Sequence, residues 1–73
     1  MVSSVASTPA ALTLRERAIA TLLAYGLTNV QIAARLSISV RTVEMHRANV
    51  MRKLDARSRA DVVRWALDRG LLR

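Results

Sequence analysis

Residues 28–54 decide the fold of this chain of 73 residues, and they run TNVQIAARL (28–36), SIS (37–39) and VRTVEMHRANVMRKL (40–54). The first and last stretches carry apolar residues three and four positions apart, the spacing that one face of a helix requires. Thr28 and Ser39 suit the N-cap positions of two helices. We therefore expect helices over Asn29–Leu36 and Val40–Leu54, joined by a turn too short for any other element.

The second of these helices has two different sides. On a helical wheel, Val50 and Leu54 lie within about 20° of Val43 and form an apolar stripe. Arg41 and Met45 lie on the opposite side, as does Arg52. The helix is therefore expected to pack through the stripe and to present arginines outward.

Two further helices are expected to flank this unit. Thr13 and Glu16 have the spacing of a capping box, which begins a helix over about Leu14–Tyr25, and Gly26 suits the left-handed residue after its last turn. Ser58 is expected to cap a helix over Arg59–Arg69 that Gly70 ends. The residues expected to face the core are Ala18, Ile19, Leu22, Leu23, Ile32, Ala33, Leu36, Val43, Val50, Leu54, Val62, Trp65 and Ala66. The sequence thus predicts an all-α four-helix bundle that contains a helix-turn-helix.

The chain is expected to divide into a tail and one domain. Residues 1–11, rich in serine, threonine and alanine, are typical of a flexible N-terminal tail or linker. Residues 12–73 contain all four helical patterns and are predicted to form the folded domain.

The charge of the chain favours an acidic partner. The formal net charge is +7, and Lys53 is the only lysine among twelve basic residues. Arginine makes bidentate contacts with phosphate and with guanine edges, so the composition suits nucleic acid. A coding bias toward arginine would give the same totals. The segment 39–59 nevertheless concentrates six basic residues against two acidic ones.

Several other functions are disfavoured. There are no cysteines, which excludes disulfides and thiolate metal sites and fits the cytoplasm. His46 is the only histidine and has no companion ligands, so it is interpreted as a half-buried structural residue rather than a metal ligand. The chain has neither a paired-carboxylate site nor a glycine-rich phosphate loop. It is not expected to be an enzyme, to bind a metal, cofactor or small-molecule ligand, or to enter a membrane.

The segment 12–63, LTLRERAIATLLAYGLTNVQIAARLSISVRTVEMHRANVMRKLDARSRADVV, resembles the LuxR/GerE-type DNA-binding domain. The matching pieces are LTLRER, LLAYGLTNVQIAARL, ISVRTVEMH, RKL and SRADVV. Within them, RTVEMHRANVM resembles in particular the FixJ- and NarL-like response-regulator output domains. Ser37 and Asp55 depart from the pattern, because such domains often carry glycine there. A left-handed serine costs about 1 kcal/mol relative to glycine, so these departures bear on stability rather than on function.

The resemblance implies sequence-specific binding to double-stranded DNA by a bacterial transcription regulator, with 40–54 as the recognition helix in the major groove. Arg41, Glu44 and Met45 match positions that contact base edges. The residues that match or suit contacts to the DNA backbone are Thr28, Gln31, Thr42, Arg47, Arg52 and Lys53. Helix 58–69 would join two copies into a homodimer, and the apolar Val63 and Leu67 have no obvious place in the core. Contact with RNA polymerase and a cytoplasmic, nucleoid-associated location are further implications.

The residues themselves leave other interpretations open. Arg41 also suits a solvated surface, Glu44 a local partner for a neighbouring arginine, and Met45 an exposed residue with no role. Arg52 and Lys53 also suit the negative end of the helix dipole.

Three charged positions outside this set are of interest. Arg57 and Arg59 suit either contact with the DNA backbone or solvation. Glu16 is expected to form an ion pair with a basic residue of 40–54.

Other functions compete with this one. The first alternative is a protein-interaction or adaptor module that pairs with other regulators through the last helix and has no need of the arginine face. A promoter-binding region like that of sigma factors also uses a helix-turn-helix, but LTLRER and ISVRTVEMH favour the LuxR type. Binding to an acidic membrane surface ranks last, because helix 40–54 has only a narrow aliphatic stripe and no aromatic residue.

Overall fold

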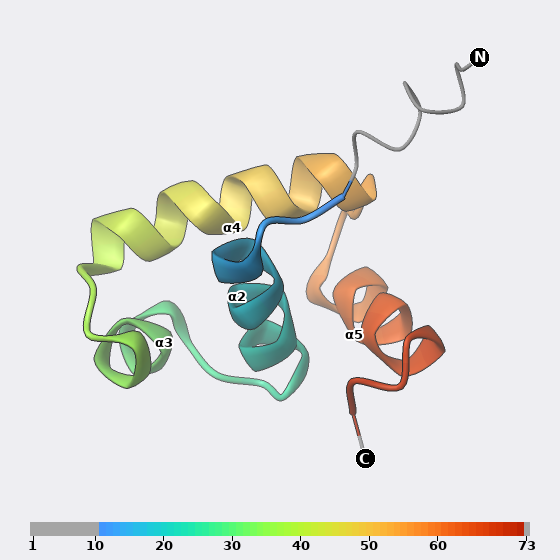
Figure 1. Ribbon diagram of the computed structural model, residues 1–73, viewed down its shortest axis with the longest axis horizontal. Coiled ribbons are helices and arrows are strands. Elements are labelled where there is room, and N and C mark those ends of the chain that lie inside the picture. The colour runs from blue at the N-terminus through green and yellow to red at the C-terminus, as the bar shows by residue number, and fades with distance from the viewer. Residues whose placement is uncertain (1–10, 73) are drawn as a thin grey trace.

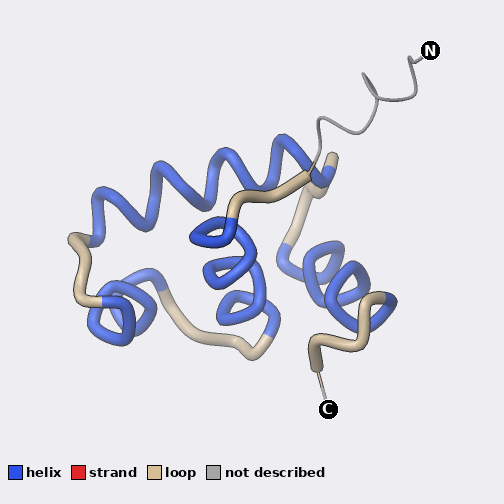
Figure 2. Tube along the Cα trace, viewed as in Figure 1, coloured by secondary structure: helices blue, strands red, loops and turns tan. Residues whose placement is uncertain are grey.

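The computed structural model describes residues 11–72, and in that range it consists of four helices and their connections (Figures 1 and 2). The helices are α2 (Leu14–Ala24), α3 (Asn29–Leu36), α4 (Val40–Leu54) and α5 (Arg59–Asp68). The predicted all-α fold is confirmed. The tail predicted over 1–11 lies outside the described residues, except for Ala11, which is exposed.

The helix bounds match the expected ones closely. α3 and α4 begin and end as predicted. α2 was expected to include Tyr25 and α5 to include Arg69, but both residues are C-caps just beyond the helices. The last turn of a helix often loosens, so its final residue is the part that a sequence pattern fixes least.

The first three helices begin on side-chain caps, as predicted. The hydroxyl of Thr13 accepts from the backbone N–H of Glu16 at 3.1 Å, and the Glu16 carboxylate accepts from the Thr13 N–H at 2.9 Å. Thr28 and Gln31 form the same reciprocal pair at the start of α3. The Ser39 hydroxyl accepts from the N–H of Thr42 at 3.0 Å. These bonds satisfy donors that the first turn of a helix leaves unpaired.

The fourth helix begins at the predicted residue but without the side-chain cap of the other three. Ser58 occupies the N-cap position of α5, but its side chain makes no capping hydrogen bond. Instead, the Asp61 carboxylate accepts from the backbone N–H of Arg57 at 2.8 Å. The carboxylate in the first turn thus orders the residues that precede α5, and it also suits the positive end of the helix dipole.

A left-handed residue follows each helix. Gly26, Ser37, Asp55 and Gly70 have φ values of 97°, 58°, 54° and 69°. The N–H of the residue after each one returns to a carbonyl five positions back, as from Leu27 to Leu22 at 3.1 Å. Ser37 and Asp55, which stand where related domains often carry glycine, thus adopt the backbone conformation that favours glycine.

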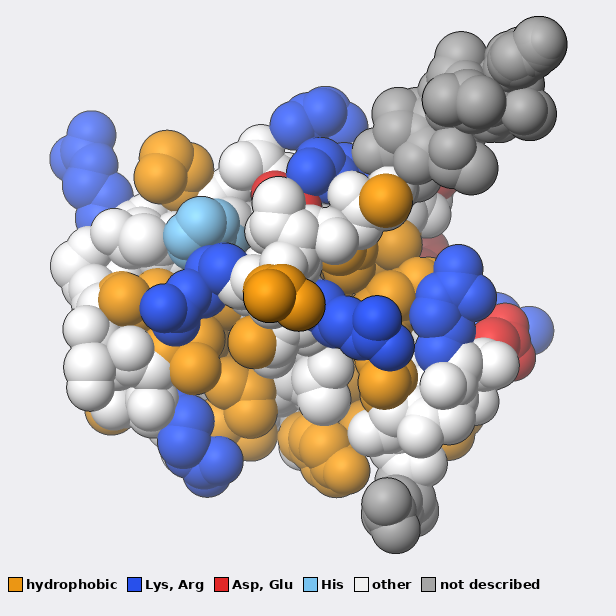
Figure 3. Space-filling model, viewed as in Figure 1, with side chains coloured by type: hydrophobic (Ala, Val, Ile, Leu, Met, Phe, Trp, Pro, Cys, Tyr) orange, Lys and Arg blue, Asp and Glu red, His pale blue; other side chains and the backbone are white. Residues whose placement is uncertain are grey.

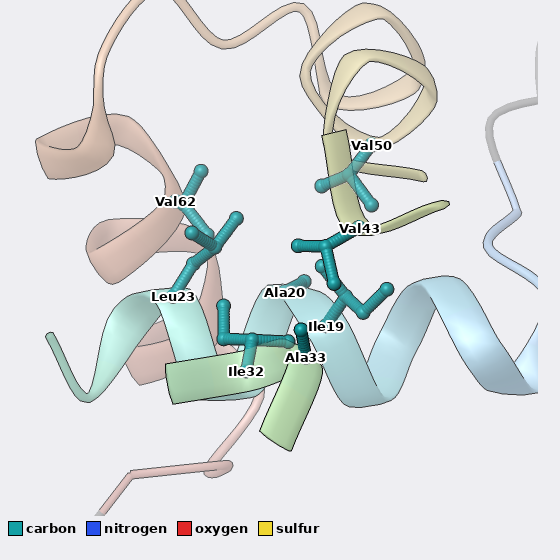
Figure 4. Close-up of a cluster of buried hydrophobic side chains, with 8 residues drawn as sticks. All are labelled: Ile19, Ala20, Leu23, Ile32, Ala33, Val43, Val50 and Val62. Atoms are coloured by element: carbon teal, nitrogen blue, oxygen red, sulfur yellow. The ribbon is translucent and has the colours of Figure 1, made fainter. Parts of the chain in front are cut away.

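One apolar core holds the four helices together (Figure 4). Val43 and Val50 of α4 are completely buried, and in Figure 4 they point toward Ile19 and Ala20 of α2. Val62 of α5 completes the opposite side of the cluster. The apolar stripe predicted for 40–54 thus faces the core, with Leu54 at its partly buried edge.

The buried face of α2 differs from the predicted stripe by about one position. Ala18 was expected in the core but is only half-buried, whereas Ala20 is completely buried. The buried residues Glu16, Ile19, Ala20 and Leu23 have the regular spacing of one helical face. The first residue of that face is a charged glutamate, so a search for apolar periodicity missed the true start of the stripe.

The arrangement leaves one side of α4 uncovered. α2 packs against both α4 and α5, and α3 packs against α4. In Figure 1, α4 runs along one edge of the molecule, and the other three helices lie on the same side of it. The residues of α4 that face away from this group are therefore available to a partner.

Candidate nucleic-acid interface

The exposed side of α4 carries the three residues predicted to contact base edges. Arg41, Glu44 and Met45 are all exposed, and 58% of the surface of Met45 is accessible. Together with Thr42 they line one shallow depression at the N-terminal end of the helix. Val43, between them in sequence, is completely buried, so the core fixes which way this row of side chains faces.

The basic residues of α4 lie along the same helix, beyond this row. Arg47 and Lys53 are half-buried and Arg52 is exposed. Figure 3 shows lysine and arginine side chains spread widely over the viewed face, with few acidic ones between them. Such a surface attracts a polyanion through its summed field as well as through individual contacts.

Three of these basic groups also form hydrogen bonds within the domain. The Arg47 guanidinium donates to Asn29 Oδ1 of α3 at 3.1 Å. The Arg52 guanidinium donates to Asn49 Oδ1 at 2.9 Å. Each bond uses one of the five N–H groups of a guanidinium, so donors remain for a second acceptor. The bonds restrain side chains that would otherwise have to be ordered on binding.

The third bond is an ion pair that joins the start of α2 to the end of α4. Lys53 Nζ of α4 lies 2.8 Å from Glu16 Oε1 of α2, and the Glu16 side chain is 6% exposed. This confirms the ion pair predicted for Glu16. The hydrogen bond from Lys53 and the backbone N–H of Thr13 lower the pKa of Glu16 below its ordinary value of about 4.5, against the opposing effect of burial. Glu16 therefore joins the capping box of α2 to the last turn of α4.

Replacing this carboxylate is expected to weaken the fold in a pH-dependent way. Since the pKa of Glu16 is lowered in the folded state, its stabilisation is present above about pH 4.5 and is lost as the pH falls through the folded value. The substitution Glu16→Gln should cost about 1.5–3 kcal/mol at neutral pH, the range for a hydrogen bond to a charged group. Its cost should shrink as the solution is acidified. Urea unfolding followed by circular dichroism at several pH values measures both effects.

Glu44→Gln is the matched control, because Glu44 is an exposed carboxylate on α4. It should change the free energy of unfolding by less than about 0.5 kcal/mol. Equal costs for the two variants, or a cost for Glu16→Gln that does not vary with pH, would contradict the role assigned to the ion pair.

The start of α3 presents two polar side chains beside α4. Thr28 and Gln31 are exposed, and each accepts a backbone hydrogen bond from the other. In these bonds the two side chains act only as acceptors. The Thr28 hydroxyl and the Gln31 amide N–H groups therefore remain as donors for an outside acceptor. They lie at the positive end of a helix dipole, where an anion is favoured.

The structure shows three contacts that sequence patterns did not reveal. The sequence pattern allows Arg59 either DNA contact or solvation, but its guanidinium donates to the backbone carbonyls of Leu23 and Leu27. The Arg69 guanidinium lies over the ring of Trp65, 5.5 Å from its centroid. Asn29 was not identified as the partner of Arg47. The bonds of Arg59 and Arg47 join residues 18 or more positions apart, which no local spacing indicates. Arg69 and Trp65 lie four positions apart at the end of α5.

The remaining predicted residues lie as follows. Leu67 is 58% exposed on α5 and Val63 is half-buried. His46 is half-buried, as predicted, and its Nδ1 is buried without a hydrogen-bond partner among the described residues. No group of three acidic, histidine or cysteine side chains within 11–72 could hold a metal ion. None of the helices in that range is both long enough and apolar enough to cross a membrane.

A helix-turn-helix whose second helix is anchored on one side and carries exposed polar and basic residues on the other defines a small domain of the DNA-binding, transcription-regulating kind. The family model described as bacterial regulatory proteins, luxR family, matches residues 10–66. The chain belongs to this family, as its resemblance implied.

Three curated relatives illustrate the similarity. The chain is 51% identical over 53 residues to the tetrathionate response regulatory protein TtrR of Salmonella typhimurium, over 73% of the chain and 26% of that protein. It is 52% identical over 56 residues to the transcriptional regulatory protein FixJ of Rhizobium meliloti, over 77% of the chain and 28% of that protein. It is 45% identical over 58 residues to the oxygen regulatory protein NreC of Staphylococcus haemolyticus, over 80% of the chain and 27% of that protein.

The chain thus matches about a quarter of the length of each of these relatives. The family and the three relatives are named as regulators, which bears out the prediction that this domain is not an enzyme.

Proposed function

We propose that this domain binds specific sequences of double-stranded DNA, with α4 in the major groove. The observation that carries the proposal is the exposed row of Arg41, Glu44 and Met45, held outward because Val43 and Val50 are buried. An arginine suits the paired acceptors of guanine, a glutamate suits the amino group of cytosine, and a methionine suits the methyl group of thymine. One row of three residues thus has the chemistry to distinguish bases.

Contacts to phosphates would fix the register of α4. The residues proposed for them are Thr28, Gln31, Thr42, Arg47, Arg52 and Lys53. Thr28 and Gln31 offer donors at the start of α3, and the basic residues of α4 supply charge along the helix. Phosphate contacts of this kind position a protein on the duplex, whereas base contacts select the sequence.

Two copies are proposed to join through α5. Leu67, which is 58% exposed, and the half-buried Val63 lie one helical turn apart and form a small apolar surface. A symmetric pair would place two α4 helices about 34 Å apart, in successive major grooves, on two inverted half-sites. Such a dimer would act on the nucleoid in the cytoplasm, and RNA polymerase is a further proposed partner at the promoter.

Selection of bound sequences from a random duplex library tests the proposal directly. Enrichment of a sequence with two inverted half-sites about one helical turn apart is the expected result. Enrichment of a single short sequence would support base recognition without the dimer. Recovery of unenriched sequence would contradict the base contacts.

Reversing the charge of Arg41 is expected to remove most of the affinity. Arg41→Glu loses a bidentate contact and adds repulsion from nearby phosphates, so binding to the selected duplex should weaken by about 100-fold or more. Fluorescence anisotropy with labelled duplex measures the change. Arg64→Glu, on the exposed part of α5, is the matched control and should retain more of the affinity.

The same variant separates the proposal from its main alternative, an adaptor that pairs with other regulators through α5. The exposed Leu67 favours a protein contact on that helix. Arg41 lies on α4 and not on α5, so an adaptor would keep its function in Arg41→Glu. If the original chain binds no duplex, and Arg41→Glu still pairs with other regulators as the original chain does, the adaptor function is favoured.

A further inference from the structure

We propose that the guanidinium of Arg59 is a positioning group that fixes the direction of α5 relative to α3 and α4. In a dimer joined through α5, it would thereby set the separation of the two recognition helices. The second statement rests on the proposed function, whereas the first concerns the single domain.

The geometry of Arg59 is that of a clamp between three parts of the chain. Arg59 is the first residue of α5 and is half-buried. Its Nη1 donates to the carbonyl of Leu23 in α2 at 2.6 Å, and its Nη2 donates to the carbonyl of Leu27 at 3.1 Å. Leu27 immediately precedes Thr28, the N-cap of α3. One side chain thus joins the beginning of α5 to the end of α2 and to the connection that leads into the helix-turn-helix.

The electrostatics of this position strengthen the clamp. The last carbonyls of a helix carry partial negative charge, and a nearby cation stabilises them. α2 has no basic residue in its own last turn, so the guanidinium of Arg59 supplies that charge from a different helix. Hydrogen bonds from a charged donor are shorter and stronger than those between neutral groups, and donation of two bonds by one planar guanidinium adds geometric specificity.

The other contacts of α5 leave its direction less well defined. Val62 and Ala66 are its completely buried residues, and both are small and apolar. The partly buried Trp65 also packs against the core, but apolar contacts of this kind are less directional than hydrogen bonds. Ser58 makes no capping bond, and the bond between Asp61 and Arg57 lies within the same turn. The apolar contacts of α5 and its local bond to Arg57 thus provide no hydrogen bond to another part of the fold. The two bonds of Arg59 provide that directional link.

The consequence for a dimer follows from the distance between the α5 surface and the N-terminal end of α4. The N-terminal end of α4 lies at the opposite end of the molecule from α5 (Figure 1). If Leu67 and Val63 lie at the dimer axis, a small rotation of α5 displaces Arg41 by a much larger amount. A change at Arg59 should therefore alter the preferred distance between half-sites more than it alters binding to one half-site.

The test uses the whole chain with the substitution Arg59→Lys, which keeps the charge but cannot donate to both carbonyls in the same fork. Binding is measured to a duplex with one selected half-site and to a series of duplexes whose two inverted half-sites differ in spacing by single base pairs. Affinity for the single half-site should stay within about twofold. Preference for the best spacing should fall about tenfold, the effect of losing one charged hydrogen bond.

The matched control is Arg17→Lys, an exposed arginine on α2 that undergoes the same chemical change. It should leave the spacing profile unaltered. If Arg59→Lys weakens binding to every duplex equally, or leaves the profile unchanged, Arg59 does not set the spacing. If the original chain binds no duplex, the proposed function fails on its own.

A second measurement tests the clamp without DNA. Residual dipolar couplings report the angle between α4 and α5 in the single domain. In Arg59→Lys this angle should change or become averaged, while the angle between α2 and α4 stays constant. An unchanged direction of α5 would overturn the assignment of Arg59 whatever the outcome with DNA.

Discussion

Raising the monovalent salt concentration from about 50 mM to about 200 mM is expected to weaken duplex binding by a factor of about 150. The basic groups of the proposed interface are Arg41, Arg47, Arg52 and Lys53, all on α4. Each phosphate that a protein neutralises releases condensed counterions, so affinity falls with salt on a logarithmic scale. If each of these four groups neutralises one phosphate, the slope is about −3.6. Anisotropy titrations with the selected duplex at several salt concentrations measure this slope.

A single basic residue should account for a defined part of that slope. Arg52→Gln removes one exposed charge of α4 and should make the slope less steep by about 0.9. Arg64→Gln removes an exposed charge of α5 and should leave the slope nearly unchanged. A flat salt response in the original chain would contradict phosphate contact by α4. Circular dichroism over the same salt range checks that the fold itself is unaffected.

The largest expected effect on stability comes from truncation at the centre of the core. Ile19 is completely buried and belongs to the same cluster as Val43 and Val50 (Figure 4). Ile19→Ala should cost about 2–5 kcal/mol, because it loses apolar burial and leaves a cavity that its neighbours only partly fill. This changes the ratio of folded to unfolded protein by about 30- to 5,000-fold. Small domains have modest total stability, so much of the variant should be unfolded at elevated temperature.

Leu14→Ala is the matched control for this prediction. Leu14 begins the same helix and is 88% exposed. Leu14→Ala removes a side chain of the same size as Ile19→Ala does, but it should change the free energy of unfolding by less than about 0.5 kcal/mol. Urea unfolding followed by circular dichroism compares the two variants. Similar costs at both positions would mean that the contacts of Ile19 do not determine the stability of the domain.

The sequence was sufficient for features that depend on neighbouring residues. The capping boxes of Thr13 and Thr28 were predicted and observed, and the left-handed turns at Ser37 and Asp55 lie where related domains often carry glycine. The apolar stripe of α4 was also predicted and observed, since three residues one or two turns apart define a helical face. The outward orientation of the Arg41 row follows from that stripe alone.

Local patterns failed where a residue has more than one suitable role. Ser58 is a common capping residue, yet the Asp61 carboxylate orders the turn before α5 in its place. Apolar periodicity does not reveal the start of the buried face of α2, because Glu16 is charged and is buried together with its bonds to Lys53 and Thr13.

The sequence by itself determined four helices, the side-chain caps of the first three and the side of α4 that faces outward, because these depend on residues within about two helical turns of one another. Only the tertiary structure decided that Glu16 pairs with Lys53 and that Arg59 binds the end of α2. Each of these contacts joins residues more than thirty positions apart, at 37 and 36 residues. Long charged side chains can reach many acceptors, and the packing of the helices selects one of them.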